Sequence, residues 1–228
     1  MFDRLKAEIR SIKARDPAVH SALEVLLLYP SFDAVRSYRI AHWFYERGYY
    51  FLARWISQRS RHKTGIEIHP GAKIGRGLFI DHGSGVVIGE TAEIGDNCTI
   101  YQNVTLGGTG KDVGKRHPTL GNNVMVGAGA RVLGPFRIGD NSKIAANAVV
   151  LEAVPPDCTA VGVPARIVRR NGARVPNRVP NSELDHIHMP DPVSEILCEH
   201  LIHIERLEKE VSRLKAELKE IKEKEQKE

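Results

Sequence analysis

The sequence predicts an α+β protein in which a helical region comes first, a parallel β-helix built from hexapeptides follows, and a coiled-coil helix ends the chain. Three observations predict this order. Apolar residues recur at helical spacing near the start, aliphatic residues recur every six positions through the middle, and a heptad pattern occupies the last part. The predicted boundaries are 1–62 for the helical domain, 63–170 for the β-helix domain, 171–192 for a linker and 193–228 for the C-terminal helix.

The first 62 residues contain apolar stripes separated by short breaks. Arg15-Asp16-Pro17 interrupts the first stripe and marks a new helix start, because proline is favoured in the first turn of a helix. Pro30-Ser31 marks a second break, and Gly48 closes the next stripe before a last helix over about residues 50–61. The aromatic side chains here are predicted to form a packing core between helices. The apolar positions are Phe2, Leu5, Ile9, Ile12, Leu23, Leu26, Leu27, Leu28, Val35, Tyr38, Trp43 and Phe44.

Between residues 66 and 168 an aliphatic residue recurs every six positions, often followed by glycine and preceded at two positions by a small or apolar residue. A fixed short period of this kind is typical of a β-solenoid, since neither a helix nor a hairpin meander keeps one phase for so long. Each unit is then a short strand and a corner. If three sides close one turn, residues about eighteen apart stack at a spacing of about 4.8 Å. The aliphatic positions are Ile68, Ile74, Ile80, Ile88, Ile94, Ile100, Leu106, Leu120, Val126, Val132, Ile138, Ile144 and Val150.

The phase of this repeat slips at two places. From Ile80 to Ile88 the step is eight positions instead of six, and the extra residues fall within residues 81–85. From Leu106 to Leu120 the step is fourteen, which we interpret as two units plus two residues, in a polar, glycine-rich stretch unfit for a strand. Loops that leave a rigid scaffold often carry function. Each slip contains a histidine beside a charged residue.

The chain leaves the repeat at Pro155-Pro156, and residues 171–192 are rich in Pro, Asn and Arg, as an extended linker would be. Apolar residues then follow the a and d positions of a heptad, with Glu, Lys and Arg between them, which favours a coiled coil over a lone surface helix. These apolar positions are Leu197, Ile204, Leu207, Val211, Leu214, Leu218 and Ile221.

The composition limits the class of function. The 228 residues carry a formal net charge of +5, which permits a phosphorylated ligand but does not demand nucleic acid. Aromatic residues gather in the first 55 residues, which argues against a base-stacking surface. The cysteines Cys98, Cys158 and Cys198 have no paired spacing, so we predict a reducing compartment without a disulfide or zinc framework. No signal peptide or spanning segment is recognisable, and we therefore expect a cytoplasmic protein.

The two phase slips carry the candidate chemistry. Asp81-His82 lies in one and Arg116-His117 in the other. A histidine near a carboxylate can act as a general base, because the carboxylate fixes its tautomer and stabilises the imidazolium. Glu67, in the preceding unit, is a candidate for that carboxylate, and the guanidinium of Arg116 suits a substrate carboxylate. From spacing alone, solvated loop residues are an equally good interpretation.

These residues resemble one family closely, the serine O-acetyltransferases. The resemblance extends from about residue 15 to about residue 169, and its Asp-His and Gly-Gly-Thr-Gly-Lys elements are more specific than the hexapeptides, which mark only a broad acyltransferase superfamily. The segments that carry it are Ile68-His69-Pro70-Gly71-Ala72-Lys73-Ile74-Gly75-Arg76-Gly77, Asp81-His82, Val87-Ile88-Gly89-Glu90-Thr91-Ala92, Val104-Thr105-Leu106-Gly107-Gly108-Thr109-Gly110-Lys111, Lys115-Arg116-His117-Pro118 and Gly162-Val163-Pro164-Ala165-Arg166-Ile167-Val168.

The resemblance implies transfer of an acetyl group from acetyl-CoA to the hydroxyl of L-serine, the step before cysteine synthesis, without a metal. It also implies a left-handed β-helix, an exception to the right-handed crossover rule, assembled as a homotrimer with active sites between subunits. By family position His82 is the catalytic base, and Glu67 stands where its carboxylate partner is expected, one methylene longer than the aspartate found in the family.

The resemblance also assigns binding residues. Serine, or cysteine as a feedback inhibitor, is expected at Asp16, Asp81, Glu90, Arg116 and His117. The two aspartates suit the ammonium group and the arginine suits the carboxylate. Small residues that let the pantetheine arm of CoA lie along the solenoid are expected at Gly108, Thr109, Ala128 and Ala146.

The chain departs from the longer family members at both ends. It lacks much of the N-terminal helical region that joins two trimers in those members, so we expect a trimer, held further by the heptads. It ends in Glu225-Gln226-Lys227-Glu228 without the terminal isoleucine that enters cysteine synthase, so we expect no such complex in the familiar form.

Three alternatives stay open. A γ-type carbonic anhydrase on the same solenoid would bind zinc through three histidines, with His69, His82 and His117 as candidates, but Asn122 stands where a further histidine is expected. A catalytically silent scaffold would use the coiled coil alone. Another acceptor, such as a sugar hydroxyl or an amine, would not need both Asp16 and Arg116, which together suit an amino acid zwitterion.

Overall fold

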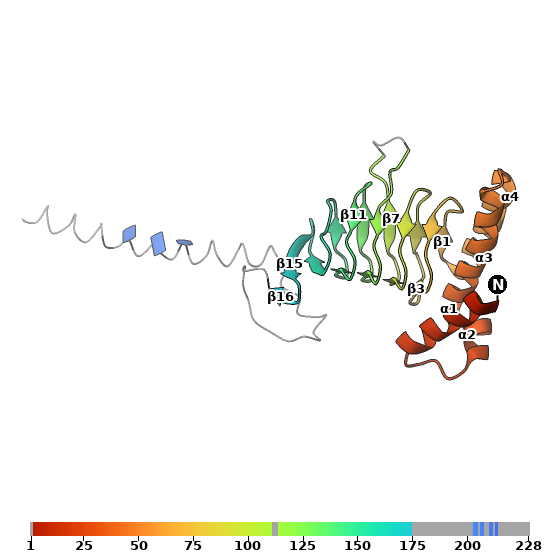
Figure 1. Ribbon diagram of the computed structural model, residues 1–228. Coiled ribbons are helices and arrows are strands. Elements are labelled where there is room, and N and C mark those ends of the chain that lie inside the picture. Colours follow the sequence, from red (N-terminus) through yellow and green to blue (C-terminus); the bar gives the residue numbers. More distant parts are fainter. Residues whose placement is uncertain are drawn as a thin grey trace, which may run out of the picture. The chain divides into compact units, whose positions relative to one another are not determined.

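The computed structural model describes residues 2–110 and 114–174 and, near the end of the chain, His203, Ile204, Arg206, Leu207, Glu210, Val211 and Arg213. In this part of the chain, four helices precede a coil of short strands (Figure 1). Among the described residues, no helix combines the length and the apolar character needed to cross a membrane.

The helices are α1 (Phe2–Arg15), α2 (Ala22–Leu28), α3 (Pro30–Tyr45) and α4 (Tyr50–Thr64). Their ends follow from local chemistry. Ser21 begins α2 through a capping box, in which its hydroxyl accepts the Glu24 N–H at 3.1 Å and the Glu24 carboxylate accepts the Ser21 N–H at 3.3 Å. Pro30 occupies the first turn of α3, and Gly65, at φ 72°, ends α4 in the left-handed conformation.

The coil has three sheets, and until the last coil its consecutive strands belong to the three sheets in turn. Sheet 1 contains β1 (Glu67–Ile68), β4 (Val87–Ile88), β7 (Thr105–Gly107), β10 (Arg131–Leu133) and β13 (Val149–Val150). Sheet 2 contains β2 (Lys73–Ile74), β5 (Glu93–Ile94), β8 (Thr119–Leu120) and β11 (Arg137–Ile138). Sheet 3 contains β3 (Phe79–Ile80), β6 (Thr99–Ile100), β9 (Met125–Val126), β12 (Lys143–Ile144), β14 (Cys158–Val161), β15 (Arg166–Arg170) and β16 (Ala173–Arg174).

All strands pair in parallel until the last coil, where β14 pairs antiparallel with β15 and β15 with β16. Within the parallel coils the aliphatic residue of each hexapeptide points inward, as the period predicts. Those of sheet 1 are Ile68, Ile88, Leu106, Val132 and Val150, each at most 4% exposed. The strand of a single coil cannot bury its side chain alone, so the core forms by stacking. The predicted parallel β-helix is therefore confirmed.

The pairing register measures how many residues each coil contains. Ile88 pairs with Leu106 and Val132 with Val150, eighteen positions apart, as a regular three-sided turn requires. Ile68 pairs with Ile88 at twenty, and Leu106 pairs with Val132 at twenty-six. The first slip therefore adds two residues, as predicted. The second slip adds eight at a single corner, because β7 and β8 are consecutive sides, so our interpretation as two units plus two residues was wrong.

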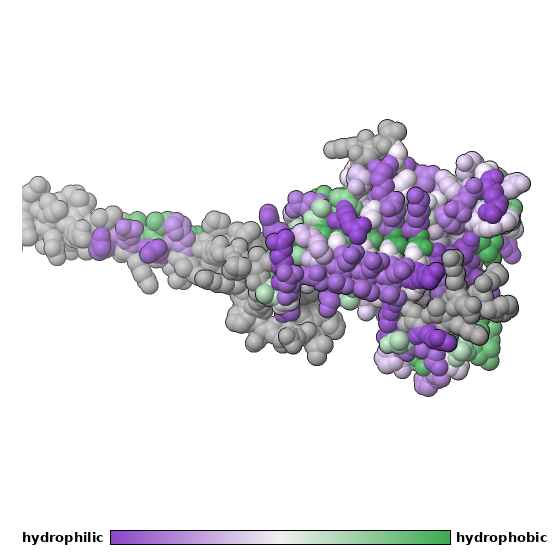
Figure 2. All heavy atoms as spheres, in the orientation of Figure 1, coloured by the Kyte–Doolittle hydropathy of each residue, from purple (hydrophilic) through white to green (hydrophobic). Residues whose placement is uncertain are grey.

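The helices α3 and α4 cover the β1 end of the coil (Figure 1). Tyr38 donates from its hydroxyl to Ala72 O at 2.5 Å, and Ser57 donates to Ile68 O at 2.7 Å. Tyr38 is buried, as predicted for the aromatic core. The prediction fails for Trp43, which is 49% exposed and stacks under Arg47. Apolar side chains are visible on the helical surface (Figure 2), where Leu27, for example, is 69% exposed.

Most of the predicted coiled coil lies outside the described residues. The described ones are helical, and Ile204, Leu207 and Val211 are 50%, 46% and 47% exposed.

Candidate active site

The corner that leads from sheet 3 to sheet 1, called here the His82 corner, contains the first insertion. Backbone hydrogen bonds identify the inserted residues. The N–H of Asp81 donates to Ile100 O, as Tyr101 N–H donates to Val126 O one coil further on. Asn103 N–H donates to Ser84 O, so only His82 and Gly83 lack equivalents in the regular corners.

Both inserted residues adopt left-handed backbone conformations. His82 has φ 57° and Gly83 has φ 80°. A side chain at Gly83 is excluded on two grounds, because its Cβ would lie 2.5 Å from Ile66 Cδ1 and because L residues rarely adopt this φ. The insertion therefore turns His82 outward. Its side chain is 76% exposed, and Nε2 lies 3.9 Å from Asp81 Oδ1, too far for a hydrogen bond.

A row of equivalent positions continues from Ser84 along the His82 corner through the next three coils. Gly129 N–H donates to Gln102 O at 2.9 Å, and Asn147 N–H donates to Ala128 O at 2.8 Å. Ala146 precedes Asn147 in the fourth coil. The predicted CoA residues Ala128 and Ala146 thus occupy the same corner as His82. Their small side chains project little from the surface of the coil.

Asp16 follows Arg15, which attaches the end of α1 to the coil just before the sheet 3 strands β3 and β6. The Arg15 guanidinium donates to Gly77 O at 2.8 Å and to Cys98 O at 3.0 Å. The Asp16 carboxylate then accepts the Ala18 N–H at 2.8 Å and the Tyr29 hydroxyl at 2.6 Å. Burial raises the pKa of Tyr29 to about 12, helped by the charges of Asp16, Glu24 and Asp81. Asp16 and Asp81 are thus both close enough to the Tyr29 phenol for their charges to raise its pKa.

The corner that leads from sheet 1 to sheet 2, called here the His117 corner, contains the second insertion. His117 is 9% exposed and its Nδ1 accepts the Thr91 N–H at 3.1 Å, with the Thr91 hydroxyl at 2.9 Å. Gly89 makes room for the ring, since a Cβ there would lie 2.0 Å from His117 Cδ2. An Nδ1 that accepts an N–H is unprotonated, so the neutral ring carries its proton on Nε2.

Burial, followed by the charge of Arg116, lowers the pKa of His117, although Glu90 opposes this. The imidazole therefore stays neutral at physiological pH. With Nδ1 engaged by Thr91, Nε2–H is the remaining hydrogen-bond donor of the ring.

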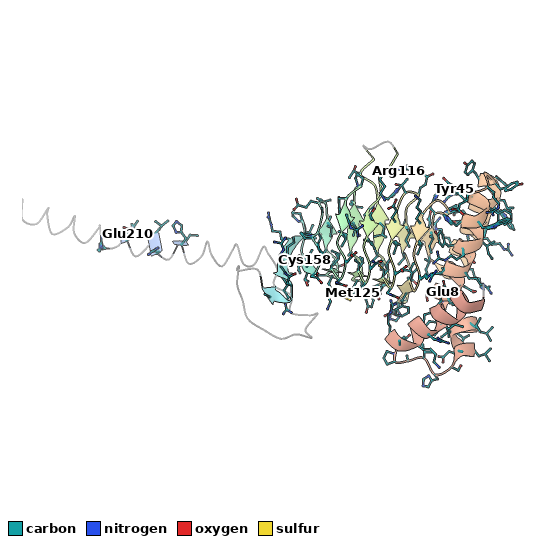
Figure 3. The ribbon with its side chains drawn as sticks, viewed as in Figure 1. Glu8, Tyr45, Arg116, Met125, Cys158 and Glu210 are labelled. Atoms are coloured by element: carbon teal, nitrogen blue, oxygen red, sulfur yellow. The ribbon has the colours of Figure 1, made fainter. Side chains whose placement is uncertain are left out.

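Glu90 connects this corner to the helices. Its carboxylate forms a short ion pair with Arg116 Nη2 and accepts the Tyr45 hydroxyl at 2.8 Å. These two hydrogen bonds, the one from Arg116 first, lower the pKa of Glu90, and burial raises that of Tyr45. Tyr45 comes from the end of α3, and it and Arg116 lie on the same side of the coil (Figure 3).

The remaining predicted residues, Gly108, Thr109 and Glu67, lie at the His117 corner and on β1. Gly108 and Thr109 begin the His117 corner, where a Cβ on Gly108 would lie 2.9 Å from Arg116 O on the returning arm of the loop. Glu67 lies on β1, and its carboxylate pairs with Arg61 Nε at 3.1 Å rather than with His82.

Apart from Glu67, which lies on β1 itself, the predicted residues fall into two groups at the two corners that border sheet 1. The sequence interpretation missed the residues that hold these groups in place, namely Tyr29, Tyr45, Thr91 and Gly89. Gly89 and Thr91 stand inside a recognised motif, but only packing shows their contact with His117. Nothing in the sequence pattern distinguished Tyr29 and Tyr45 from ordinary core tyrosines.

The zinc alternative finds little support in the donor set. Within residues 2–110 and 114–174 and the described helical residues, no group of three or more His, Cys, Asp or Glu side chains is arranged to hold a metal ion. His69 and His117 lie at the His117 corner, where the charge of Glu90 raises the pKa of each, whereas His82 lies at the other corner.

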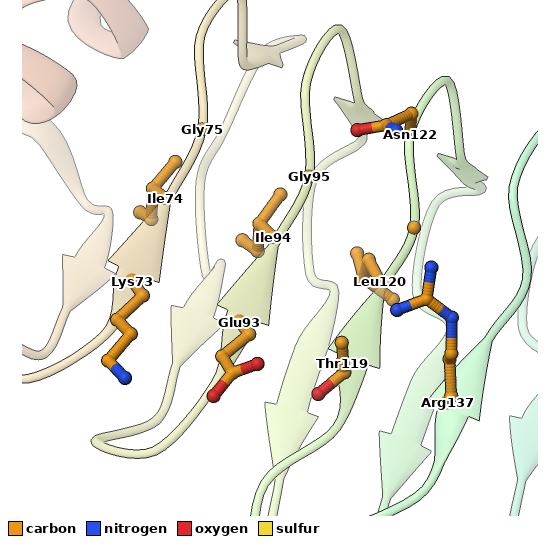
Figure 4. Close-up of a pocket in the computed structure, with 11 residues that line it drawn as sticks. Lys73, Ile74, Gly75, Glu93, Ile94, Gly95, Thr119, Leu120, Asn122 and Arg137 are labelled. Carbon is orange, nitrogen blue, oxygen red and sulfur yellow. The ribbon is translucent and has the colours of Figure 1, made fainter.

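An open groove of about 450 Å³ runs along sheet 2 (Figure 4). Lys73, Glu93, Thr119 and Arg137 point outward along its strands, and none of the predicted site residues lines it. A smaller hollow of about 270 Å³, bordered by Tyr45, Glu90 and Thr91, belongs to the His117 corner.

A three-sided coil of hexapeptides with two interrupted corners is the architecture of a hexapeptide-repeat protein. The family model described as "Bacterial transferase hexapeptide (six repeats)" matches residues 117–152.

Similarity to known proteins narrows this class. The chain is 54% identical over 214 residues to the serine acetyltransferase of Synechococcus elongatus, covering 94% of this chain and 85% of that protein. It is similar, with a TM-score of 0.73 and 44% identity, to the crystal structure of a Brucella abortus serine acetyltransferase in complex with coenzyme A, covering 74% of this chain and 68% of that one. The Neisseria gonorrhoeae enzyme in complex with serine matches with a TM-score of 0.71 and 44% identity, over 74% and 69% of the two chains. The chain belongs to the serine acetyltransferase family.

Proposed function

We propose that this chain catalyses serine O-acetylation with His82 as the general base. Acetyl-CoA is the acetyl donor and L-serine the acceptor. The imidazole takes the proton of the serine hydroxyl as its oxygen attacks the thioester carbonyl. The C–S bond of the tetrahedral intermediate then breaks, and the imidazolium returns the proton to the CoA sulfur. The observation that carries this proposal is the insertion at residues 82 and 83, which turns one imidazole out of an otherwise regular corner.

The base needs a partner that orients its ring. We assign this role to Glu67, whose carboxylate is held by Arg61 in the single chain. The ion pair is half exposed on the arginine side, and such pairs contribute little stability. Glu67 therefore gives up this contact at small cost when a better partner is present.

The amino acid is recognised through its two charges. Asp16 and Asp81 bind the ammonium group, because their carboxylates lie in one region and no cation of the described residues forms an ion pair with either except His82. Arg116 binds the carboxylate with the donors that Glu90 leaves available, and Nε2–H of His117 adds a neutral donor. A sugar hydroxyl would need neither charged group.

The two groups of residues belong to different corners, so we propose that a neighbouring copy completes each site in a homotrimer. The His82 corner of one chain would face the His117 corner of the next across sheet 1. Val87, on the outer face of that sheet, is 37% exposed in the single chain, which supports a contact there. We also retain the left-handed winding of the coil as part of this proposal.

The CoA groove would follow the row of small residues at the His82 corner. Ala128 and Ala146 form its floor, and Gly108 and Thr109 of the neighbouring His117 corner form its rim. Alanine side chains at these positions leave room for the narrow pantetheine arm, and a larger side chain would obstruct it.

The C-terminal heptads are proposed to associate with those of other copies. Ile204, Leu207 and Val211 expose about half of their apolar surface on a helix, which a coiled coil would bury.

A thiol-release assay tests the function. Purified protein with acetyl-CoA should release CoA rapidly with serine, and much more slowly with homoserine, threonine or simple sugars. Faster release with a sugar than with serine would overturn the assignment of the acceptor.

A further inference from the structure

The N-terminal helices contribute one tyrosine to each half of the divided site. Tyr29, between α2 and α3, donates its hydroxyl to Asp16 at 2.6 Å. Tyr45, in the last turn of α3, donates its hydroxyl to Glu90 at 2.8 Å. In both cases the phenol meets a carboxylate that the proposed function uses for the amino acid.

Each phenol fixes a carboxylate that a second donor already holds. At Asp16 the second donor is the Ala18 N–H on the other oxygen, at 2.8 Å. At Glu90 it is Arg116, also on the other oxygen. With both oxygens held, the plane of each carboxylate cannot rotate freely. The remaining lone pairs therefore point in fixed directions.

We propose that Tyr29 and Tyr45 are positioning residues, Tyr29 for the ammonium half of the amino acid acceptor and Tyr45 for its carboxylate half. Tyr29 acts through Asp16, which binds the ammonium. Tyr45 acts through Glu90, which orients Arg116 toward the carboxylate. This inference rests on the proposed serine acetyltransferase function.

The local chemistry keeps both phenols as donors. Burial and neighbouring acidic groups raise the pKa of Tyr29 to about 12 and also raise that of Tyr45. Neither phenol therefore ionises in the range where the enzyme would be assayed. The ring of Tyr45 is held in addition by edge contacts with His69, at 5.7 Å, and with Tyr50, at 4.9 Å.

The substitutions Tyr29→Phe and Tyr45→Phe remove one hydroxyl each and keep the ring. Each should raise the KM for serine about two- to tenfold, the worth of one ordinary protein hydrogen bond. We expect little change in kcat at saturating serine or in the KM for acetyl-CoA. Tyr49→Phe is the matched control, because Tyr49 is 59% exposed and lies outside both groups.

Two serine analogues, used as competitive inhibitors against serine, test the ammonium half and the carboxylate half of the site separately. Tyr29→Phe should weaken inhibition by ethanolamine, which keeps the ammonium, and leave that by 3-hydroxypropanoate unchanged. Tyr45→Phe should do the reverse. Equal effects on both analogues, or no inhibition of the wild-type enzyme by either, would overturn the division into halves.

A double-mutant cycle tests whether Tyr29 acts through Asp16. In the Asp16→Asn background, Tyr29→Phe should have a clearly smaller effect on the serine KM than in the wild type. Additive effects, or a rise in the acetyl-CoA KM, would contradict a positioning role. Wild-type protein that does not acetylate serine would instead refute the proposed function, so the two failures are distinguishable.

Discussion

The His82 corner and the His117 corner place their imidazoles in opposite environments, one exposed to solvent and the other buried against the coil. Two inserted residues place His82 outside the coil, with its side chain 76% exposed and no hydrogen bond to Asp81. At the second insertion His117 instead packs against the coil, where it is 9% exposed and held by Thr91. One imidazole is left free for a partner and the other is fully preorganised. In the proposed function each corner supplies half of a site: the exposed imidazole is the base, and the buried imidazole is a binding group.

The largest effect should follow from removing the exposed imidazole. His82→Ala should lower kcat by roughly two to four powers of ten, the usual contribution of a positioned base, with little change in acetyl-CoA binding. The matched control is His62→Ala, an exposed histidine on α4. Steady-state thiol release measures both. Unchanged turnover in the His82 variant would remove His82 from the mechanism.

At the His117 corner, activity and stability should instead depend on how Gly89 packs against the His117 ring. Gly89→Ala places a Cβ about where the His117 ring lies, so the ring must move. We expect kcat/KM for serine to fall roughly a hundredfold, as for a misplaced binding group, and stability to fall by about 1–3 kcal/mol from overpacking.

Adding His117→Ala to Gly89→Ala should restore stability but not activity, which denaturant unfolding and thiol release would show together. A Gly89→Ala protein with normal stability and activity would contradict the packing described for this corner.

A smaller effect should follow at Thr91, whose hydroxyl oxygen accepts the N–H groups of Arg116 and His117 at 3.0 and 3.1 Å. Thr91→Val keeps the shape and leaves these donors without a partner, costing about 1–3 kcal/mol of stability and raising the serine KM. Thr91→Ser keeps the hydroxyl and should remain close to the wild type. Equal behaviour of the two variants in thermal unfolding would show that the hydroxyl does not hold the corner.

The smallest effect concerns pH. Because the pKa of Glu90 is lowered from 4.5, its contribution to stability is present above that value and lost as the pH falls through the folded pKa. The pair with Arg116 is about one-third exposed, so this contribution is under about 1 kcal/mol. The difference in Tm between the wild type and Glu90→Gln should shrink between neutral pH and pH 3. A constant difference would mean that the ion pair does not contribute.

Much of the fold follows from the sequence because the period of six has only one structural interpretation over so many units. Ile88, Leu106 and Val132 were predicted to point inward, and they do. The size of the second insertion did not follow. The fourteen positions from Leu106 to Leu120 can be two hexapeptides plus two extra residues, or one hexapeptide plus eight extra residues. The hydrophobic repeat has the same phase after Leu120 in both cases, so it cannot distinguish them. The register of Leu106 against Val132 can.

For the candidate site too, the sequence predicts some features and not others. Motifs locate His82, Arg116 and His117, since each stands in an insertion. They do not reveal that Tyr29 reaches Asp16 or that Tyr45 reaches Glu90, because these contacts span 13 and 45 positions and depend on how the helices dock on the coil. They also do not predict that Glu67 pairs with Arg61 in the single chain.

The most direct measurement of the central claim mixes two variants, each of which we expect to be nearly inactive. His82→Ala chains and His117→Ala chains are unfolded, combined in equal amounts and refolded together, and serine acetylation is assayed. If each site uses His82 of one copy and His117 of its neighbour, random trimers should regain about one quarter of wild-type activity. A mixture no more active than the two variants refolded separately would contradict a site shared between copies.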